Sequence, residues 1–579
     1  MATEHLLEEF PPVSTAEWEE VIAQELKGRD YEKSLIWHTA EGLSVKPYYR
    51  AEDVKGLDGA PEKFDDRRGE RTTGEWQIRV EVSKSSTDAA NRAACAAVAS
   101  GAEGIAFSSV MVRSRGDLER VTANLGEIPL QFERADERLV RLLVDWVNER
   151  QNGAMVSTGF DALANVKFAA ESIAAAPLSL RPFTVHGEAF EEAGATAVEE
   201  IGFALAAGVD FVAAMQEEGV GADRAAASME FRFAVGANYF FQIAKLRAFR
   251  LLWARAMESF GCGPDAARTW IAARTSRWNK TVYDPHVNIL RATTEAMAAV
   301  LGGADSVTIA PFDECYKAPD EASRRLAQNT QLLLKHEAWL GRVADAGGGS
   351  YYLETITDFL AGEGWKRMQE IEARGGYRKA QADGTIAQTL DRGLAAREKA
   401  VATRRRILVG TNQFVNVAEQ ARERVDALRV SETKRGSQAF EELRLRTERF
   451  AASGGRLPRI MLAEIGDVRM RAARSGFAAG LFACAGLEAE TRRFKKVAEI
   501  AAAEADLIVL CSADQEYGAV AEELIPNLKK LGRATPVIVA GNPENSAELR
   551  AAGIADFVNV RSNAVEVLSR WQERLGITN

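Results

Sequence analysis

Small polar residues that could bind a ligand follow short apolar runs near the end of this 579-residue chain. Asp467, Ser512 and Gly541 each come just after such a run, and Gly466 precedes the first of them. In an open parallel α/β sheet, ligands bind outside the carboxyl ends of the strands. These residues therefore mark a candidate cofactor site, although a glycine such as Gly541 can also serve turn geometry alone.

The candidate site has no histidine, because the last histidine of the chain is His336. Imidazole is the commonest metal ligand among side chains, so we predict no metal ligand there. The five cysteines are widely spaced and form no Cys-x-x-Cys pair: Cys95, Cys262, Cys315, Cys484 and Cys511. Their spacing argues against a zinc site and against a disulfide framework.

The elements that must position these residues form the most regular part of the sequence. Apolar runs alternate with helical patterns, which is typical of a doubly wound sheet of flavodoxin type. The expected strands are 459–463, 506–511, 536–540 and 556–560, and the expected helices are 468–485, 492–503, 519–531 and 564–575.

A longer alternating region precedes this domain, from Trp76 to about residue 360. Its expected strands include 76–82, 104–107, 179–185, 231–235 and 306–310, and its clearest helices are 87–100 and 238–257. Short, mostly apolar strands suit a parallel sheet covered by helices. Such repetition over so long a stretch predicts an α/β fold with a (β/α)8 TIM barrel.

Four segments follow from these patterns. We predict an N-terminal arm over 1–75, the barrel over 76–410, a helical linker over 411–455 and the flavodoxin-like domain over 456–579. An arm of this kind either wraps a partner subunit or packs on its own barrel. The linker is rich in Arg and Glu, and Arg404-Arg405-Arg406 precede it, so both are expected to form solvated helix faces.

Composition limits the possible partners. The formal net charge of −10 disfavours nucleic acid or an anionic membrane, although a local basic patch could still hold a phosphorylated ligand. No stretch approaches the roughly 18 uninterrupted apolar residues that a membrane helix requires. The first ten residues, Met1 to Phe10, are acidic and lack the basic and apolar regions of a secretory signal. We therefore expect a cytoplasmic protein with no nucleic-acid or membrane partner.

A set of ordered motifs carries a family resemblance. They are Glu192-Ala193-Gly194-Ala195-Thr196, Thr275-Ser276-Arg277-Trp278-Asn279-Lys280, Asp284-Pro285-His286-Val287-Asn288, Ala327-Gln328-Asn329-Thr330-Gln331 and Gly348-Gly349-Ser350-Tyr351-Tyr352. In this order they resemble the methylmalonyl-CoA mutase family, from about residue 20 to the C-terminus. The resemblance implies a CoA-substrate barrel and a cobalamin-binding domain, with radical chemistry supplied by adenosylcobalamin.

The cofactor motif of that family is altered in this chain. Its corrin domain carries Asp-x-His-x-x-Gly after the first strand, and the imidazole binds cobalt. Here the window begins at Asp467, with Arg469 at the histidine position and Ala472 at the glycine position. A guanidinium stays protonated and has no lone pair to offer a metal. The resemblance therefore implies that Asp467, Ser512 and Gly541 are vestigial cofactor-binding residues.

The barrel also departs from the active members of the family. They carry a Tyr-His pair shortly before the Glu192 motif, where this chain has Glu188-Ala189. His186 lies nearby, and we interpret it as a structural rather than a catalytic histidine. The first barrel strand also lacks the aromatic and arginine-rich stretch with which active members take up the CoA tail.

These losses together resemble the small, non-catalytic subunit of heterodimeric members of the family. We expect a structural subunit with no catalytic residues and no cofactor of its own. A larger catalytic subunit would bind adenosylcobalamin and interconvert methylmalonyl-CoA and succinyl-CoA. Two alternatives stay open: a stand-alone mutase that acts on a related acyl-CoA, with cobalamin held without a histidine, and a non-catalytic CoA-binding or cobalamin-delivery protein.

Overall fold

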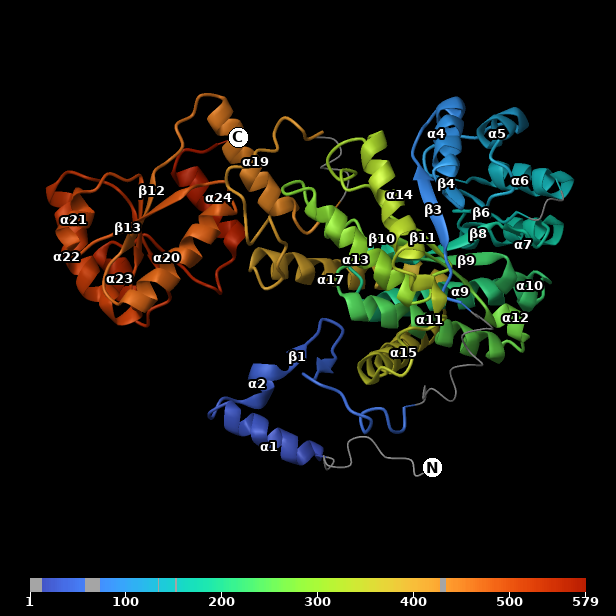
Figure 1. Ribbon diagram of the computed structural model, residues 1–579, viewed down its shortest axis with the longest axis horizontal. Helices are drawn as coiled ribbons and strands as arrows, with labels where there is room; N and C mark the ends of the chain where they lie inside the picture. Colours follow the sequence, from blue (N-terminus) through green and yellow to red (C-terminus); the bar gives the residue numbers. More distant parts are fainter. Residues whose placement is uncertain (1–12, 58–72, 134, 151–153, 427–433, 579) are drawn as a thin grey trace, which may run out of the picture.

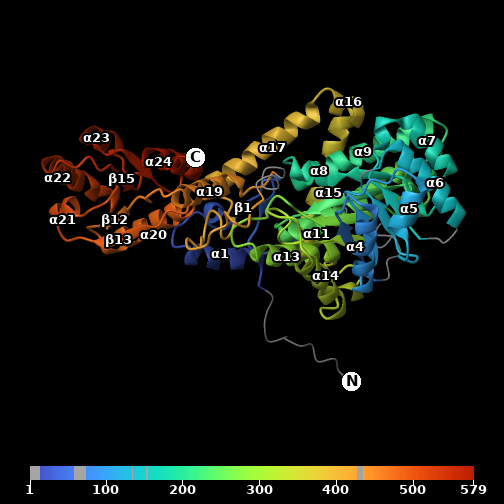
Figure 2. The ribbon, with the colours of Figure 1, turned by 90° about the horizontal axis from the view of Figure 1, so that it is seen from above.

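The computed structural model describes residues 13–57, 73–133, 135–150, 154–426 and 434–578. An N-terminal arm, a parallel barrel and a smaller C-terminal sheet domain follow one another along the chain (Figure 1). Helices α17 (Thr385–Ala402) and α19 (Gln438–Ala452) lie between the barrel and the C-terminal domain in both ribbon views (Figures 1 and 2). The segment Met1 to Phe10, on which the prediction about a secretory signal rests, lies outside the described residues.

The arm begins with two helices and continues with a small hairpin. Its elements are α1 (Thr15–Glu25), α2 (Tyr31–Leu35), β1 (Trp37–His38) and β2 (Ser44–Val45). β1 and β2 pair antiparallel, a hairpin that the sequence did not reveal. Two ring contacts join the arm to barrel helices, from Trp37 to Phe241 at 5.8 Å and from Tyr49 to Tyr352 at 5.1 Å.

The barrel sheet is parallel and nearly closed, which confirms the predicted TIM-type fold. Its order is β7-β6-β5-β4-β3-β11-β10-β9-β8. The strands are β3 (Gln77–Val82), β4 (Gly104–Phe107), β5 (Leu130–Phe132), β6 (Val156–Thr158), β7 (Leu180–Arg181), β8 (Phe183–His186), β9 (Met229–Val235), β10 (Trp270–Thr275) and β11 (Ser306–Thr308). The two end segments, β7 and β8, belong to one stretch of chain that is interrupted at Pro182.

Proline explains this interruption, because it has no N–H to donate to a neighbouring strand. Two threonine hydroxyls bridge the gap instead. Thr158 donates its Oγ1 hydrogen to the carbonyl of Pro182 at 2.6 Å, and Thr184 donates to the carbonyl of Thr158 at 2.7 Å. The sheet is therefore held together at the place where the backbone ladder fails.

Helices cover the outside of the barrel. They include α4 (Thr87–Ala99), α5 (Arg115–Thr122), α6 (Glu137–Arg150), α7 (Val166–Ala175), α8 (Gly187–Glu192), α9 (Ala197–Glu217), α10 (Ala222–Ala227), α11 (Tyr239–Ser259), α12 (Pro264–Ala267), α13 (Val287–Leu301), α14 (Glu321–His336) and α15 (Tyr351–Glu372). The outward side chains of β9 meet α11, where Phe249 lies 4.6 Å from Phe231 and 4.7 Å from Phe233, ring to ring. The apolar core of the barrel therefore lies between the sheet and the helices.

The linker between the domains differs from its prediction, because its charges are not all solvated. Arg435 and Glu441 form an ion pair at 2.7 Å in which both side chains are completely buried. Glu441 also accepts the backbone N–H of Val282, which is 159 residues away in sequence. Arg406 packs on the ring of Trp278 at 4.3 Å, and burial lowers its pKa to about 10. Sequence composition could not reveal these distant partners.

The C-terminal domain has the flavodoxin-like strand order that the sequence predicts. All five strands are parallel, in the order β13-β12-β14-β15-β16. They are β12 (Ile460–Glu464), β13 (Ala489–Arg493), β14 (Leu507–Cys511), β15 (Val537–Ala540) and β16 (Asp556–Val558). The helices are α20 (Val468–Ala483), α21 (Val497–Ala502), α22 (Tyr517–Lys530), α23 (Ser546–Ala552) and α24 (Ala564–Arg574).

The sequence-based prediction is partly wrong for one helix of this domain. Residues 489–493 form the edge strand β13, and only 497–502 are helical, where the sequence predicted a helix over 492–503. The strand reads Ala-Glu-Thr-Arg-Arg and is largely exposed, so it has no apolar run that would reveal it. Edge strands often carry charged side chains, which discourage pairing with another chain.

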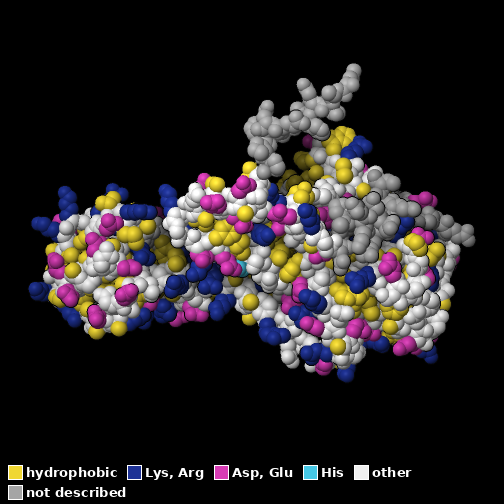
Figure 3. Space-filling model, turned by 90° about the horizontal axis from the view of Figure 1, so that it is seen from below, with side chains coloured by type: hydrophobic (Ala, Val, Ile, Leu, Met, Phe, Trp, Pro, Cys, Tyr) yellow, Lys and Arg dark blue, Asp and Glu magenta, His cyan; other side chains and the backbone are white. Residues whose placement is uncertain are grey.

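Charged side chains of both signs are interspersed over the face of the molecule in Figure 3. No helix within the described ranges is long and apolar enough to cross a membrane. The boundaries at residues 75, 410 and 455 stay predictions, which limited proteolysis would test.

Candidate functional sites

The carboxyl edge of the C-terminal sheet brings the predicted cofactor residues together. The chain leaves β12 for β13 on one side and returns to β14 on the other, so the strand order reverses between β12 and β14. Doubly wound sheets bind ligands at such a switch point. Asp467 and Ser512 lie in the two flanking loops, and Gly541 follows β15. We call this edge, with Gly466 and residues 512–517, the switch-point crevice.

The Glu516 side chain occupies the centre of the crevice. Its carboxylate accepts the backbone N–H groups of Asp467, at 3.1 Å, and of Ala513, also at 3.1 Å. It also accepts the Ser512 hydroxyl. The Ser512 hydrogen bond, helped by the two backbone N–H groups, lowers the pKa of Glu516. Gly466 has a φ of +77°, a conformation that favours glycine, and a Cβ there would lie 2.2 Å from this carboxylate.

Tyr517 fills the next part of the crevice, towards β15. Its ring is completely buried, its hydroxyl donates to the carbonyl of Ala540 at 2.8 Å, and it accepts the N–H of Ser512 at 3.0 Å. A Cβ at Gly541 would lie 3.1 Å from the Tyr517 ring and 2.8 Å from an Asp514 oxygen. Gly541 thus makes room for side chains of the same domain.

Asp467 acts as the N-cap of α20. Its carboxylate accepts the N–H of Met470 at 2.8 Å, which satisfies one of the free donors of the first helical turn. Arg469 is exposed in that same turn, and Ala472 is exposed one turn further on. A structural role therefore accounts for the retained aspartate.

The residues of the crevice do not fit a cobalt corrin that is held through a histidine. No group of three or more His, Cys, Asp or Glu side chains in the described part of the chain could hold a metal ion. Glu516 and Tyr517 take up the loop interior, and an ion pair at 3.0 Å joins Arg474 to Asp514 across its mouth. The structure brings Asp467, Ser512 and Gly541 to one edge, and their earlier role in cofactor binding stays a prediction.

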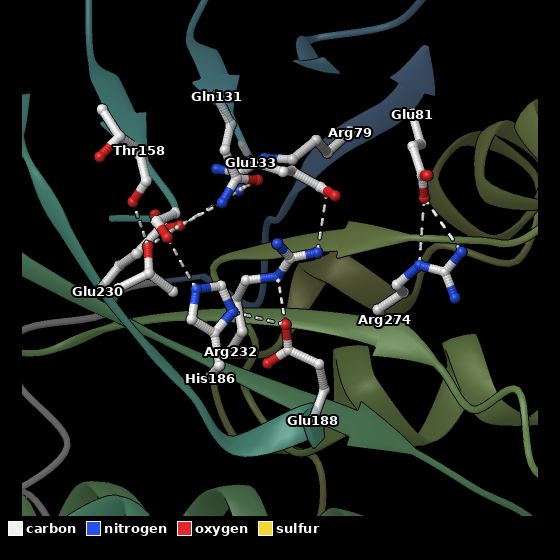
Figure 4. A network of polar contacts seen from close by, with 12 residues as sticks. Arg79, Glu81, Gln131, Glu133, Thr158, His186, Glu188, Glu230, Arg232 and Arg274 are labelled. Carbon is white, nitrogen blue, oxygen red and sulfur yellow. Dashed lines mark hydrogen bonds and ion pairs between the residues drawn. The ribbon is translucent and has the colours of Figure 1, made fainter. Parts of the chain in front are cut away.

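The barrel lumen is the second candidate site, and charged side chains fill it (Figure 4). At one level Arg79, from β3, donates to the Gln131 oxygen at 2.7 Å, and the Gln131 amide donates to Glu230 at 2.6 Å. Arg79 also lies 3.8 Å from Glu230. Glu230 is completely buried and Arg79 nearly so. Burial lowers the pKa of Arg79.

A second level of the lumen is centred on Arg232, from β9. Its guanidinium lies 3.0 Å from Glu133 and 3.3 Å from Glu188 (Figure 4). Burial alone would raise the pKa of Glu188, but Arg232 and then His186 lower it to about 2. The carboxylate is therefore ionised at neutral pH.

His186 has partners at both ring nitrogens. Nδ1 lies 3.0 Å from the Glu188 carboxylate and Nε2 lies 3.2 Å from the carbonyl of Gly159. Burial disfavours the charged ring, yet the Glu188 carboxylate raises the pKa of His186. Two acceptors suit a doubly protonated ring, which agrees with the structural role that the sequence analysis preferred. Glu188, at the position of the missing pair, is part of the same network.

A third cluster joins the lumen to the carboxyl face of the barrel. Arg274, from β10, lies 3.0 Å from Glu81 and 2.8 Å from Glu314. Burial would raise the pKa of Glu81, but Arg274 lowers it to about 2. The axis of a TIM barrel is normally packed with branched aliphatic side chains. Here ion pairs fill it.

Neither set of filling side chains was predicted from the sequence. A sequence pattern that indicates polar side chains in the lumen is present in β3, where Gln77, Arg79 and Glu81 alternate with apolar residues. The same alternation recurs in β9 with Glu230 and Arg232. Strands covered by helices on the outside show such alternation when the inward side chains are polar. The crevice offered a weaker signal, the polar run Asp514-Gln515-Glu516 directly after a strand.

A parallel α/β barrel followed by a flavodoxin-like sheet domain defines the general class of this protein. Within that class, residues 160–461 match the family model described as "Methylmalonyl-CoA mutase". The chain belongs to the methylmalonyl-CoA mutase family.

Relatives support the same assignment over the full length. The chain is 35% identical to a methylmalonyl-CoA mutase small subunit of Porphyromonas gingivalis, over 99% of both chains. It is 32% identical to the small subunit of Streptomyces virginiae, over 99% of this chain and 98% of the relative. The identity to a methylmalonyl-CoA mutase of Rhizobium meliloti is 30%, over 75% of this chain and 68% of the relative.

Proposed function

We propose that this chain is the small, structural subunit of an adenosylcobalamin-dependent methylmalonyl-CoA mutase. A larger homologous subunit binds the cofactor and interconverts methylmalonyl-CoA and succinyl-CoA by radical rearrangement. The complex works in the cytoplasm, and the acyl-CoA substrate reaches it through the larger subunit. The full-length similarity to chains named small subunits supports this proposal.

One observation carries the structural role, namely that the chain's own polar side chains fill both the barrel lumen and the switch-point crevice. Arg79, Arg232 and Arg274 occupy the lumen, and each is at least 93% buried. Glu516 and Tyr517 occupy the switch-point crevice. Opening either position would separate buried charges or leave buried polar groups without partners, which costs several kcal/mol.

The cofactor is therefore assigned to the larger subunit. In this chain an arginine stands at the position of the cobalt ligand, and the neighbouring Asp467 caps a helix. Adenosylcobalamin supplies radical chemistry to the family when it is bound. We interpret Asp467, Ser512 and Gly541 as remnants of its site.

The arm supports the presence of a partner subunit. Helix α1 contains no buried residue, and its Trp18 and Val21 are 46% and 53% exposed. Trp18 stacks on Tyr48 at 5.0 Å, so the exposed surface is an ordered aromatic pair. In Figure 1, α1 and α2 project from the body of the molecule. Exposed aromatic side chains on a projecting element are typical of a subunit interface.

Purification with and without the larger subunit tests the proposal. The chain alone should show no mutase turnover and no corrin absorbance after incubation with adenosylcobalamin and gel filtration. Coexpression with a homologue that has an intact Asp-x-His-x-x-Gly motif should give a one-to-one complex that is active and carries one corrin. Stoichiometric cofactor uptake by this chain alone would overturn the assignment.

A further inference from the structure

A small cavity of about 170 Å³ lies where α15 ends and α17 begins, and none of its lining residues belongs to either candidate site. Three arginines line it: Arg367 from the end of α15, Arg374 from the turn that follows this helix, and Arg392 from α17. We call it the arginine pocket. Figure 2 shows α16 (Tyr377–Ala382) close to the start of α17, and α17 runs from there towards the C-terminal domain.

The charges of the arginine pocket are not balanced from within. Glu370 is the carboxylate that lines it, and Arg367 engages it at 2.8 Å. No carboxylate in the described residues lies within ion-pair distance of Arg374 or Arg392. The guanidinium of Arg392 donates to the carbonyl of Gln388 and to the Thr389 hydroxyl, both at 3.2 Å. The lining therefore carries an excess of positive charge.

One buried donor of the pocket also lacks an acceptor. The Nε–H of Arg367 is shielded from solvent and has no hydrogen-bond partner in the described chain. A buried donor without a partner costs roughly 1–3 kcal/mol, so native structures usually satisfy it. An anion in the pocket would lie beside Arg367, which lines it, and would neutralise the excess positive charge.

The surrounding elements favour an anion as well. The pocket includes the first turn of α17, where the Asp383 carboxylate already accepts the N–H of Thr385 at 2.9 Å. Helix N-termini of this kind attract negative charge. Asp383 lies outside the lining; hydrogen bonds from Thr385, and further the charges of Arg374 and Lys379, lower its pKa. The Asp383 carboxylate is thus already engaged by the loop that holds it.

We propose that the arginine pocket binds a phosphate group of a small phosphorylated metabolite. A water molecule takes up about 30 Å³ in the liquid, so the cavity holds a phosphate group, whereas drug-sized ligands need roughly 300 Å³ or more. The rest of the metabolite therefore lies outside the pocket. Planar guanidinium groups match the geometry of phosphate oxygens in pairs. The site is independent of the cofactor assignment and of the larger subunit.

Calorimetric titration of the full-length chain with four probes tests the proposal. ADP and pyrophosphate should bind at one site per chain, adenosine should not bind, and inorganic phosphate should bind more weakly than ADP. The variant R374Q/R392Q should weaken ADP binding by about tenfold or more, because each guanidinium contributes charge-assisted hydrogen bonds to the phosphate. Both side chains are exposed, so the fold should survive.

A matched control separates a site from general charge attraction. The variant R92Q/R138Q removes the same charge from two exposed arginines on α4 and α6, and it should bind ADP as the parent chain does. Hydrogen exchange gives a readout without mutation, since ADP should protect the end of α15 and the first turn of α17. Absence of saturable binding, or equal losses in both double variants, would overturn the proposal. Equal affinity for inorganic phosphate and ADP would support the site and identify free phosphate as its occupant.

Discussion

The barrel lumen and the switch-point crevice are both filled by side chains, but by different kinds of interaction. In the lumen, arginines pair with carboxylates from distant strands, and Arg274 and Glu81 are 193 residues apart in sequence. In the crevice, Glu516 and Tyr517 bind mainly backbone groups, and the Glu516 contact to Asp467 spans 49 residues. The lumen therefore depends on the closed barrel, whereas the crevice depends on two neighbouring loops.

This difference shows two ways in which a ligand position can be filled. Buried ion pairs are stable only while every partner is present, since a single charge left in a low-dielectric interior is costly. Hydrogen bonds to backbone groups satisfy donors that the loops would expose in any case. We expect the lumen to respond strongly to loss of one charge, and the crevice to respond locally and weakly.

A fall in pH should have the largest effect on folding stability, and it should destabilise the barrel before the C-terminal domain. The folded-state pKa values of Glu81 and Glu188 are about 2, well below the ordinary value of a glutamate. Their stabilisation is present above the unfolded-state pKa and is lost as pH falls from about 5 towards 2, roughly 6 kcal/mol for the two together. The raised pKa of His186 does not contribute there, because the ring is protonated in both states.

Chemical denaturation between pH 7 and pH 3 measures this effect. Trp571 reports on the C-terminal domain and Trp253 on the barrel, since both are completely buried, so Trp-to-Phe variants distinguish the two transitions. As pH falls, the denaturant concentration at the midpoint of barrel unfolding should decrease more than that of the C-terminal domain. An equal shift of the two would contradict the contrast between lumen and crevice.

Replacing Arg232 with alanine should have the next largest effect. The change leaves Glu133 and Glu188 without their shared guanidinium in the lumen, and we expect the barrel to lose about 3–5 kcal/mol of unfolding free energy. Urea denaturation at pH 7 measures the loss. The exposed Arg138 offers a matched control, since R138A should change stability by less than about 0.5 kcal/mol.

Replacing Tyr517 with phenylalanine should have a smaller, local effect. It leaves the carbonyl of Ala540 without its donor and the N–H of Ser512 without its acceptor, at a cost of about 1–3 kcal/mol. Only the C-terminal transition should shift, and hydrogen exchange should increase at Ser512. A comparable loss in the barrel transition would show that the two regions are coupled.

Restoring the missing motif should have no effect on cofactor binding. The variant R469H/A472G recreates Asp-x-His-x-x-Gly, but Glu516 and Tyr517 still fill the crevice, so we expect no corrin to co-elute on gel filtration. The variant R469H/A472G/E516A/Y517A, which also removes the two side chains that fill the crevice, is the variant with which it is compared. Cobalamin uptake by R469H/A472G alone would show that the histidine, rather than the filled crevice, is decisive.

Much of the fold could be predicted from sequence, because it rests on local patterns. The apolar runs at 104–107 and 506–511 coincide closely with β4 and β14, and the sequence placed Gly466, Ser512 and Gly541 just after apolar runs that it predicted as strands. The edge strand β13 could not be predicted, since its residues are polar and are positioned by β12 alone. The buried pair Arg435–Glu441 was interpreted as solvated, because composition does not show what packs above a helix.

For the candidate sites too, one part could be predicted from the sequence and another part could not. The sequence by itself determined that a guanidinium at position 469 cannot bind cobalt, because that limit lies in the chemistry of one side chain. Only the tertiary structure decided that the lumen and the crevice are filled. Filling depends on which side chains from separate strands and loops converge on one volume, as Arg232, Glu133 and Glu188 do in the barrel. Residue type is local, whereas occupancy of space is a property of the whole fold.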